Sequence, residues 1–317
     1  MAGLLDIFLR VLLPLTIVWG AGFLARRLFQ LDPRPFSRVA FYFLAPSIVF
    51  VSLMETQVTA DEAGRIFLAV LLLFAVLAVL SSGVGCLLRL PPPEQSGFVL
   101  SSVLINSTNY GFPVVLLAFG SAGLERAVVF GIGAALLANS LGVYVAARGR
   151  AGGTKEALRQ VLQVPMVYGV LLALVLRLLG LRGGDTMVLG GQEIAWLTGP
   201  YRGVKLLSQA AIPLFSLVLG MQLAGDQRAG FSWPMLLAGA IRLALSPLVA
   251  WGLVRMFGLS GLAAQVTILE AAMPTAVMSV ILSTEFDAAP RFVSTTVVGT
   301  TLASLGTLTV LLHLLGA

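Results

Sequence analysis

Charged residues, cysteine and histidine are all scarce in this chain of 317 residues. Lys, Arg, Asp and Glu together make up 11% of the sequence, whereas soluble domains contain about 25%. The single cysteine, Cys86, excludes a disulfide framework, and with the single histidine, His313, it leaves too few ligands for a Cys/His metal site. The same scarcity argues against a membrane-embedded enzyme, which needs a nucleophile with a base or a metal.

Hydrophobic residues account for 58% of the chain and recur in apolar runs along its whole length. A helix that crosses the hydrocarbon core of a bilayer, about 30 Å thick, needs roughly 20 apolar residues. We therefore predict an all-α membrane protein with ten transmembrane helices, embedded in the lipid bilayer. The runs fall at about 7–28, 37–54, 66–89, 97–120, 125–147, 163–181, 205–224, 233–257, 261–285 and 290–315. The first run has no basic segment before it, which predicts a retained helix and not a signal peptide.

The excess of basic residues does not indicate a nucleic-acid partner, because basic residues of membrane proteins collect in cytoplasmic loops. With the N-terminus outside, eleven Lys and Arg of the predicted loops and their edges fall on the cytoplasmic side, against seven on the opposite side. We therefore expect both termini to lie outside and segment 148–162 to form a cytoplasmic linker.

The fourth apolar run holds the polar segment Asn106-Ser-Thr-Asn-Tyr-Gly-Phe-Pro113 at its centre. Pro113 removes a backbone N–H, and Gly111 permits backbone angles that other residues avoid. Non-helical backbone at membrane depth is tolerated only where it is buried in protein or lines a water-filled cavity. We predict a discontinuous helix that forms a solute site. The alternative is a kinked helix whose Asn side chains only join neighbouring helices.

Spaced motifs suggest that residues 1–147 and 163–317 are two copies of one five-helix unit within a single transporter, 1–317. Because five is odd, the second copy would be inverted in the membrane, and inverted repeats place a substrate site between interrupted helices in matching positions. This predicts a second break, which Glu270-Ala-Ala-Met-Pro-Thr-Ala276 supplies in the ninth run. The matching motifs are Ser96-Gly97 with Ser260-Gly261, Ser140-Leu-Gly142 with Ser304-Leu-Gly306, and Pro46 and Met54 with Pro213 and Met221.

The two broken segments make the chain resemble the auxin efflux carrier family of membrane transporters. That family includes plant auxin exporters and bacterial proteins linked to dicarboxylates such as malonate and malate. The resemblance implies a scaffold and a transport domain, crossed broken helices 4 and 9 that hold the substrate, alternating access of the elevator type, and a homodimer. It also places the protein in a bacterial cytoplasmic (inner) membrane. The residues that carry it are Asn106, Gly111, Pro113, Gly120, Gln163-Val-Pro165, Pro213, Gly220, Glu270–Ala276, Glu285-Phe286, Ala289-Pro290 and Ser294-Thr295-Thr296.

Three departures from the plant exporters argue against auxin itself as the substrate. The segment between the fifth and sixth runs is short, Met166 stands where those exporters have a polar contact, and the third run holds no acidic residue. The more distant sodium/bile-acid symporters carry a cation-binding Glu at the place similar to Glu270, which suggests an ion role for that residue.

Seven residues are candidates for substrate binding: Asn106, Asn109, Gly111, Pro113, Arg242, Pro274 and Thr275. The Asn amides can hydrogen-bond a carboxylate or coordinate a cation, or they can join neighbouring helices. Ser107 and Thr108 are candidate ion ligands with Glu270, although such hydroxyls commonly bond to their own backbone.

Glu270 and Arg242 are ionisable residues predicted to lie at membrane depth. Insertion scales put the free-energy cost of a charged side chain there at about 2.5–3.5 kcal/mol. Glu270 can bind Na⁺ or carry a proton, or form a structural ion pair with Arg242. Arg242 can neutralise Glu270 or contact an anionic substrate through its planar guanidinium. For Arg177, near the end of its run, we expect extension to the membrane interface.

Half-helices offer N-terminal ends that suit an anion and C-terminal carbonyls that suit a cation. Crossed breaks thus provide both polarities in one place. We predict a secondary transporter of a small organic anion, coupled to Na⁺ or H⁺ and without any other cofactor. The alternative is a solute-binding channel or sensor without coupled transport.

Overall fold

A computed structural model describes residues 3–147, 163–225 and 230–316, so the predicted linker 148–162 lies outside the described residues. Within these ranges seven helices are long and apolar enough to cross a membrane. The prediction of an all-α membrane protein is confirmed in this coarser sense. The seven are Leu4–Phe29, Pro33–Glu55, Ala60–Leu87, Ser107–Ala146, Ala195–Leu223, Trp233–Met256 and Pro290–Leu315.

The first half of the chain combines α-helices with single π-helical turns, labelled η. Its elements are α1 (Leu4–Ile7), η1 (Phe8–Leu12), α2 (Leu13–Phe29), α3 (Pro33–Val39), η2 (Ala40–Leu44), α4 (Ala45–Glu55), α5 (Ala60–Leu87), α6 (Pro92–Val103), η3 (Ser107–Gly111), α7 (Phe112–Leu137), η4 (Ala138–Gly142) and α8 (Val143–Ala146). The short helix α6 ends at a break in the backbone before η3 begins.

The second half repeats this combination and adds three very short strands. Its elements are α10 (Pro165–Leu178), β1 (Leu181–Arg182), β2 (Val188–Leu189), β3 (Gln192–Glu193), α11 (Ala195–Leu223), α12 (Trp233–Ala240), η5 (Ile241–Leu245), α13 (Ser246–Met256), α14 (Gly261–Ala271), α15 (Met278–Glu285) and α16 (Pro290–Leu315). Here α14 is the short helix, and a second break separates it from α15.

Proline explains where most of the π-helical turns lie. Pro14, Pro46, Pro113 and Pro247 each stand second in the α-helix that follows η1, η2, η3 and η5. A proline ring clashes with the carbonyl four residues earlier and cannot donate to it. In a π-helical turn that carbonyl bonds five residues ahead, so the wider turn accommodates the proline without ending the helix.

Gly120 divides α7 into two parts that run in different directions. Its backbone angles (φ 67°, ψ −163°) are not helical, and this left-handed φ favours glycine because it has no Cβ. The segment Ser107–Ala146, 40 residues long, therefore consists of a helix up to Phe119 and a second helix after Gly120.

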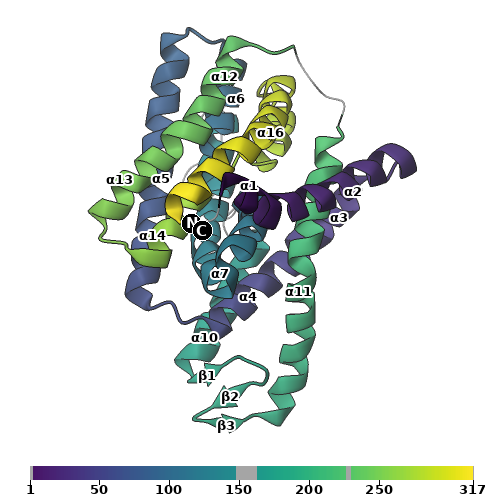
Figure 1. The fold of residues 1–317 in the computed structure, drawn as a ribbon, viewed down its shortest axis with the longest axis vertical. Helices are drawn as coiled ribbons and strands as arrows, with labels where there is room; N and C mark the ends of the chain where they lie inside the picture. The colour runs from purple at the N-terminus through teal and green to yellow at the C-terminus, as the bar shows by residue number, and fades with distance from the viewer. Residues whose placement is uncertain (1–2, 148–162, 226–229, 317) are drawn as a thin grey trace.

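The helices pack in two groups. In the first, α11 packs on α2 and α4, and α10 packs on α4; in the second, α5 packs on α6, α7 and α13, while α14 packs on α7 and α13. Figure 1 shows the first group along one side with α11 at its edge, and α5, α13 and α14 on the other side. The groups meet where α11 touches η3 and where α4 and η1 touch α7.

Glycine allows the backbones of α2 and α11 to touch within the first group. A Cβ on Gly220 would lie 2.0 Å from the Trp19 carbonyl oxygen, and one on Gly22 would lie 2.1 Å from the Leu217 carbonyl oxygen. Real Cβ atoms do not approach so closely, so any larger residue would separate the two helices.

The segment between α10 and α11 forms an antiparallel sheet of three two-residue strands in the order β1-β2-β3. It lies at the lower end of the molecule in Figure 1, beside the start of α11. Arg177, at the end of α10, donates hydrogen bonds to the carbonyl oxygens of Leu53 (2.6 Å) and Thr56 (3.1 Å). Arg177 thus caps the C-terminal end of α4, and the extension of its side chain to the membrane interface stays a prediction.

Candidate functional site

The two breaks cross each other and pair as short extended segments. Ile105 lies opposite Thr275 in an isolated antiparallel bridge. The Asn106 N–H donates to the Pro274 carbonyl (3.0 Å), and the Ala276 N–H donates to the Leu104 carbonyl (2.9 Å). Buried backbone groups need hydrogen-bond partners, and each break supplies those that the other lost by leaving the helix. The predicted crossing of the segments around Pro113 and Pro274 is present.

Hydroxyl side chains fix the crossing from several directions. Thr275 Oγ1 donates to the Ser101 carbonyl (2.7 Å), and Ser279 Oγ donates to the Leu100 carbonyl (3.2 Å). The Thr275 N–H in turn donates to Thr300 Oγ1 on α16 (3.3 Å). The candidate residues Pro274 and Thr275 therefore belong to the framework of the crossing, and both are buried.

The N-terminal end of the helix after the first break starts with η3, which no side chain caps. The first N–H groups of a helix have no partner within it, and they carry partial positive charge. The Gly111 N–H donates to the Asn106 carbonyl (3.1 Å), which closes the π-helical turn. Pro113 follows this wider turn, which accommodates the proline ring without ending the helix.

A cavity of about 440 Å³ opens between the two groups of helices. Four successive candidate residues line it, Asn106, Ser107, Thr108 and Asn109, together with Ala276–Met278 from the second break and the start of α15. Cavities of about 300–1,000 Å³ hold small molecules. The cavity therefore reaches the crossing and has room for a small solute.

Asn106 is the most deeply placed amide of this cavity. Its side chain is 4% exposed, and Nδ2 has no hydrogen-bond partner among the described residues. Ser107 Oγ is also buried without a partner, whereas Thr108 and Asn109 are half-buried. A buried amide without a partner carries a desolvation cost, which a ligand carboxylate at this point would relieve.

Glu270 lies directly behind the cavity wall, at the end of α14. It is fully buried, and neither carboxyl oxygen has a partner of good hydrogen-bond geometry among the described residues. Ser107 is the side chain close enough to interact with it. A Cβ on Gly111 would lie 2.4 Å and 2.6 Å from the two oxygens, so Gly111 provides the space in which the carboxyl group sits.

Arg242 takes neither of the two positions considered for it. It is 0% exposed and does not line the cavity, and the described residues show no ion pair between it and Glu270. Its guanidinium instead donates to the carbonyl oxygens of Val103 (2.9 Å), Ser102 (3.2 Å) and Ala271 (2.6 Å). These carbonyls lie at the C-terminal ends of α6 and α14.

Five polar residues at the cavity were not singled out as site residues from the sequence: Ser37, Arg38, Tyr42, Asn139 and Gln222. Asn139 donates to the Ala135 carbonyl (2.8 Å), and Gln222 Nε2 donates to Ser37 Oγ (3.4 Å) while its Oε1 is buried without a partner. Asn139 and Gln222 interrupt apolar runs in the sequence, which is a signal that could have found them. Arg38 lies at the edge of a predicted loop, where basic residues are common in membrane proteins and do not indicate a binding site.

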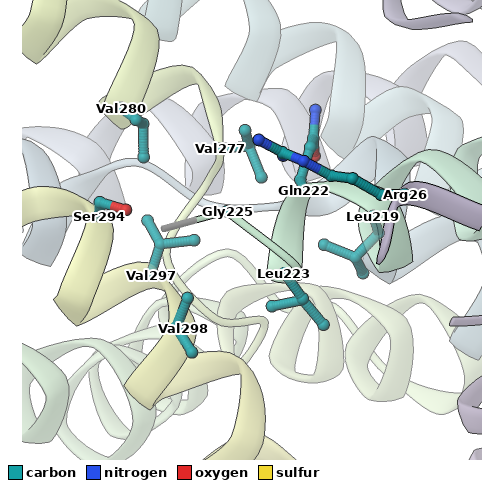
Figure 2. A pocket seen from close by; sticks show the side chains of 10 residues that line it. All are labelled: Arg26, Leu219, Gln222, Leu223, Gly225, Val277, Val280, Ser294, Val297 and Val298. Atoms are coloured by element: carbon teal, nitrogen blue, oxygen red, sulfur yellow. The ribbon is translucent and has the colours of Figure 1, made fainter. Parts of the chain in front are cut away.

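A smaller cavity of about 190 Å³ adjoins the first, because Gln222 and Val277 line both. Figure 2 shows Arg26 reaching over it from α2, with Ser294 of α16 on the opposite side. The Arg26 guanidinium donates to the Met221 carbonyl (3.1 Å) and so caps the end of α11. Both cavities lie toward the C-terminal ends of α2 and α11.

The sequence matches the model of a family described as "Membrane transport protein" over residues 7–312. The chain belongs to the membrane transport protein family. The resemblance to the auxin efflux carriers is thereby confirmed at the level of the family. Membership makes this protein a membrane transporter and points away from an enzyme.

Two relatives in this membrane transport protein family come from archaea. One is an uncharacterised transporter of Methanothermobacter thermautotrophicus, 29% identical over 279 residues, which are 86% of each chain. The other, an uncharacterised transporter of Methanocaldococcus jannaschii, is 25% identical over 274 residues, or 85% of each chain. The similarity to each relative thus extends over most of the chain.

Proposed function

We propose that this transporter moves a small organic anion, such as a dicarboxylate, by secondary active transport with alternating access. The observation that carries the proposal is the buried Asn106 amide, unpartnered at Nδ2, which faces a cavity beside the uncapped N-terminal end of η3. Helix N-terminal ends favour anions through their N–H groups and partial charge.

The charges around the cavity also favour an anion. Among the described residues that line it, Arg38 is basic and none is acidic. Met278 belongs to the first turn of α15, so the starts of two half-helices face the same space. A carboxylate at Asn106 and Asn109 would accept amide hydrogen bonds there, and Arg38 would attract it from the cavity mouth.

The packing supports ten transmembrane helices arranged as two inverted repeats of five, 1–147 and 163–317. If helix n corresponds to helix n+5, the contact of α2 with α11 corresponds to that of α4 with α10. The contact of α5 with α6 likewise corresponds to that of α13 with α14, and all four are observed. In this scheme α6–α7 and α14–α15 are the broken fourth and ninth helices, and the helix after Gly120 is the fifth.

The orientation follows from the same scheme. Both cavities lie toward the side of the basic loop after α2, which we place in the cytoplasm, so the conformation is open to the inside and both termini lie outside. The opposite side is closed by Glu125 Oε2 on α7, which accepts from Thr56 Oγ1 and from the Gln57 N–H (2.9 Å each). We place the protein in a cytoplasmic membrane as a homodimer, with the α2, α4, α10 and α11 group as scaffold and the other group moving as an elevator.

Coupling is assigned to Glu270, with Ser107 and Thr108 as accessory oxygens. A fully buried carboxylate without a charged partner is unfavourable, and binding of either H⁺ or Na⁺ compensates its charge. Because Glu270 and Gly111 are in contact, and Gly111 closes the turn that presents Asn106, a cation at Glu270 can influence the substrate site.

The test is counterflow of labelled malonate or malate in proteoliposomes, comparing wild type with Asn106→Ala. Thr309→Ala is the matched control, because among the described residues this hydroxyl bonds within α16, to the Leu305 carbonyl (2.6 Å). We expect saturable counterflow in wild type and control and its loss in Asn106→Ala. Equal flux in all three would remove Asn106 from the site, and conductance that does not saturate would favour a channel.

A further inference from the structure

The C-terminal ends of α6 and α14 converge on the side of the crossing that faces away from the cavity. The last carbonyls of a helix lack partners within it and carry partial negative charge. In α6, the Leu100 and Ser101 carbonyls accept from the Ser279 and Thr275 hydroxyls. The carbonyls of its last two residues, Ser102 and Val103, accept only from Arg242 among the hydrogen bonds described.

The last carbonyl of α14 also accepts its hydrogen bonds from side chains. The carbonyl of its last residue, Ala271, accepts from Arg242 Nη2 (2.6 Å) and from Ser246 Oγ (2.6 Å), and Arg242 Nη2 also contacts Ser246 Oγ. Arg242 and Ser246 lie one turn apart on η5 and α13. One guanidinium thus joins two half-helices that come from opposite halves of the chain.

We propose that Arg242 is a resident cation of the crossing, which holds the two half-helix C-terminal ends together in place of an inorganic ion. Clusters of carbonyl oxygens at half-helix ends are places where transporters of this architecture coordinate Na⁺. Here the three carbonyls and the Ser246 hydroxyl surround a fixed positive group with several N–H donors in a rigid fork. An exchangeable cation is therefore not needed at these carbonyls.

A carbonyl cluster occupied by Arg242 also limits where the coupling ion can bind, a point that rests on the proposed transport function. If the Arg242 guanidinium occupies the carbonyl cluster permanently, the coupling ion has to bind elsewhere. Glu270 is a buried carboxylate on α14, the helix whose last carbonyl Arg242 binds. The role of Arg242 in holding the crossing together does not depend on that function.

The test measures unfolding temperature in detergent for Arg242→Lys, Arg242→Met and Arg242→Ala. Arg255→Met is the matched control: Arg255 lies on the same helix but is exposed and stacks on Trp251, 4.2 Å from the ring centroid. We expect Arg242→Met and Arg242→Ala to unfold about 5–8 °C below wild type, as loss of one member of a buried charged network predicts. Arg242→Lys should retain most of the stability, and Arg255→Met should match wild type.

A second measurement uses methylguanidinium chloride, at concentrations that do not denature, as the probe. The alanine variant leaves space beside the carbonyls, so methylguanidinium should raise its unfolding temperature more than the same concentration of N-methylglucamine chloride. Wild type and Arg242→Met, whose side chains fill the space, should not respond.

Each outcome decides the question. Equal stability of the Lys and Met variants, or an alanine variant that ignores methylguanidinium, would overturn a role for charge. If the uncharged variants yield no folded protein while Arg242→Lys does, charge is required as proposed. If Arg242→Lys fails too while Arg255→Met folds, the shape of the fork and not a resident positive charge is required, and the proposal is wrong. Failure of malonate or malate counterflow would leave these results intact.

Discussion

Gly111→Ala is the most informative single perturbation of the crossing, because it adds one methyl group at the Glu270 carboxyl. The backbone of Gly111 is ordinary helix, with φ −64° and ψ −51°, so an alanine there meets no backbone strain. The added Cβ would lie 2.4 Å and 2.6 Å from the two carboxyl oxygens and 2.7 Å from the carboxyl carbon. All three distances are shorter than van der Waals contact, and Glu270 or the crossing must move.

The expected cost follows from the close packing around this position. Inserting a methyl group into a well-packed core costs about 1–3 kcal/mol, which corresponds to a fall of about 2–5 °C in unfolding temperature for a chain of this size. Tryptophan fluorescence during thermal unfolding measures this shift. Gly83→Ala on α5 is the control, since a Cβ there meets nothing within 4 Å and alanine favours the helix.

A double-mutant cycle with Glu270→Ala separates the contact from other effects. Without the carboxyl group the alanine at 111 has space, so Gly111→Ala should become neutral or slightly stabilising in that background. The coupling between the two positions should reach about 1–3 kcal/mol. If Gly111→Ala costs the same in both backgrounds, the carboxyl group does not sit against Gly111 and our account of Glu270 is incorrect.

Two further variants test coupling and closure. Glu270→Gln keeps the size of the side chain but removes its charge, so malonate exchange should persist while uptake driven by an Na⁺ or pH gradient falls to the level of protein-free liposomes. Gradient-driven uptake equal to wild type would exclude Glu270 from coupling. Glu125→Ala removes the acceptor of Thr56 and Gln57, and loss of hydrogen bonds to a charged group costs about 1.5–3 kcal/mol. A cysteine placed at Asn109 should then react faster from the side opposite the cavity, and an unchanged rate would argue against closure by Glu125.

The sequence predicted the breaks because their causes are local. Asn, Gly and Pro in the middle of an apolar run favour non-helical backbone wherever the run packs. Pro274 stands in the second break, whereas the first break lies at Leu104–Asn106, before Pro113, whose ring the η3 turn accommodates within the helix. The second break was expected from the repeat alone, and the structure brings it against the first through Ile105 and Thr275. The polar segment around Asn106 lines the cavity as a binding segment would.

The roles of Arg242 and Arg177 could not be predicted in the same way. From a sequence, a buried arginine is expected to form an ion pair with a carboxylate, because acidic residues can be identified by their type. Carbonyl groups occur at every residue, and they become acceptors for a side chain only where a helix ends. The ends of α4, α6 and α14 had to be located in three dimensions before their partners could be recognised. The positions of Arg38 and Gln222 at the cavity could not be predicted for a related reason. The helices that carry them lie beside the crossing only in the folded protein.

The most direct test of the central claim is thiol labelling of Met278→Cys in a Cys86→Ser background. Met278 is half-buried and lines the cavity at the start of α15, whereas Cys86 is exposed and would otherwise react. In proteoliposomes of known orientation, a membrane-impermeant maleimide should label the new cysteine from the side of the loop after α2, and malonate or malate should slow the reaction. Labelling that is absent from both sides, or that no small carboxylate slows, would contradict a solute site at the crossed breaks.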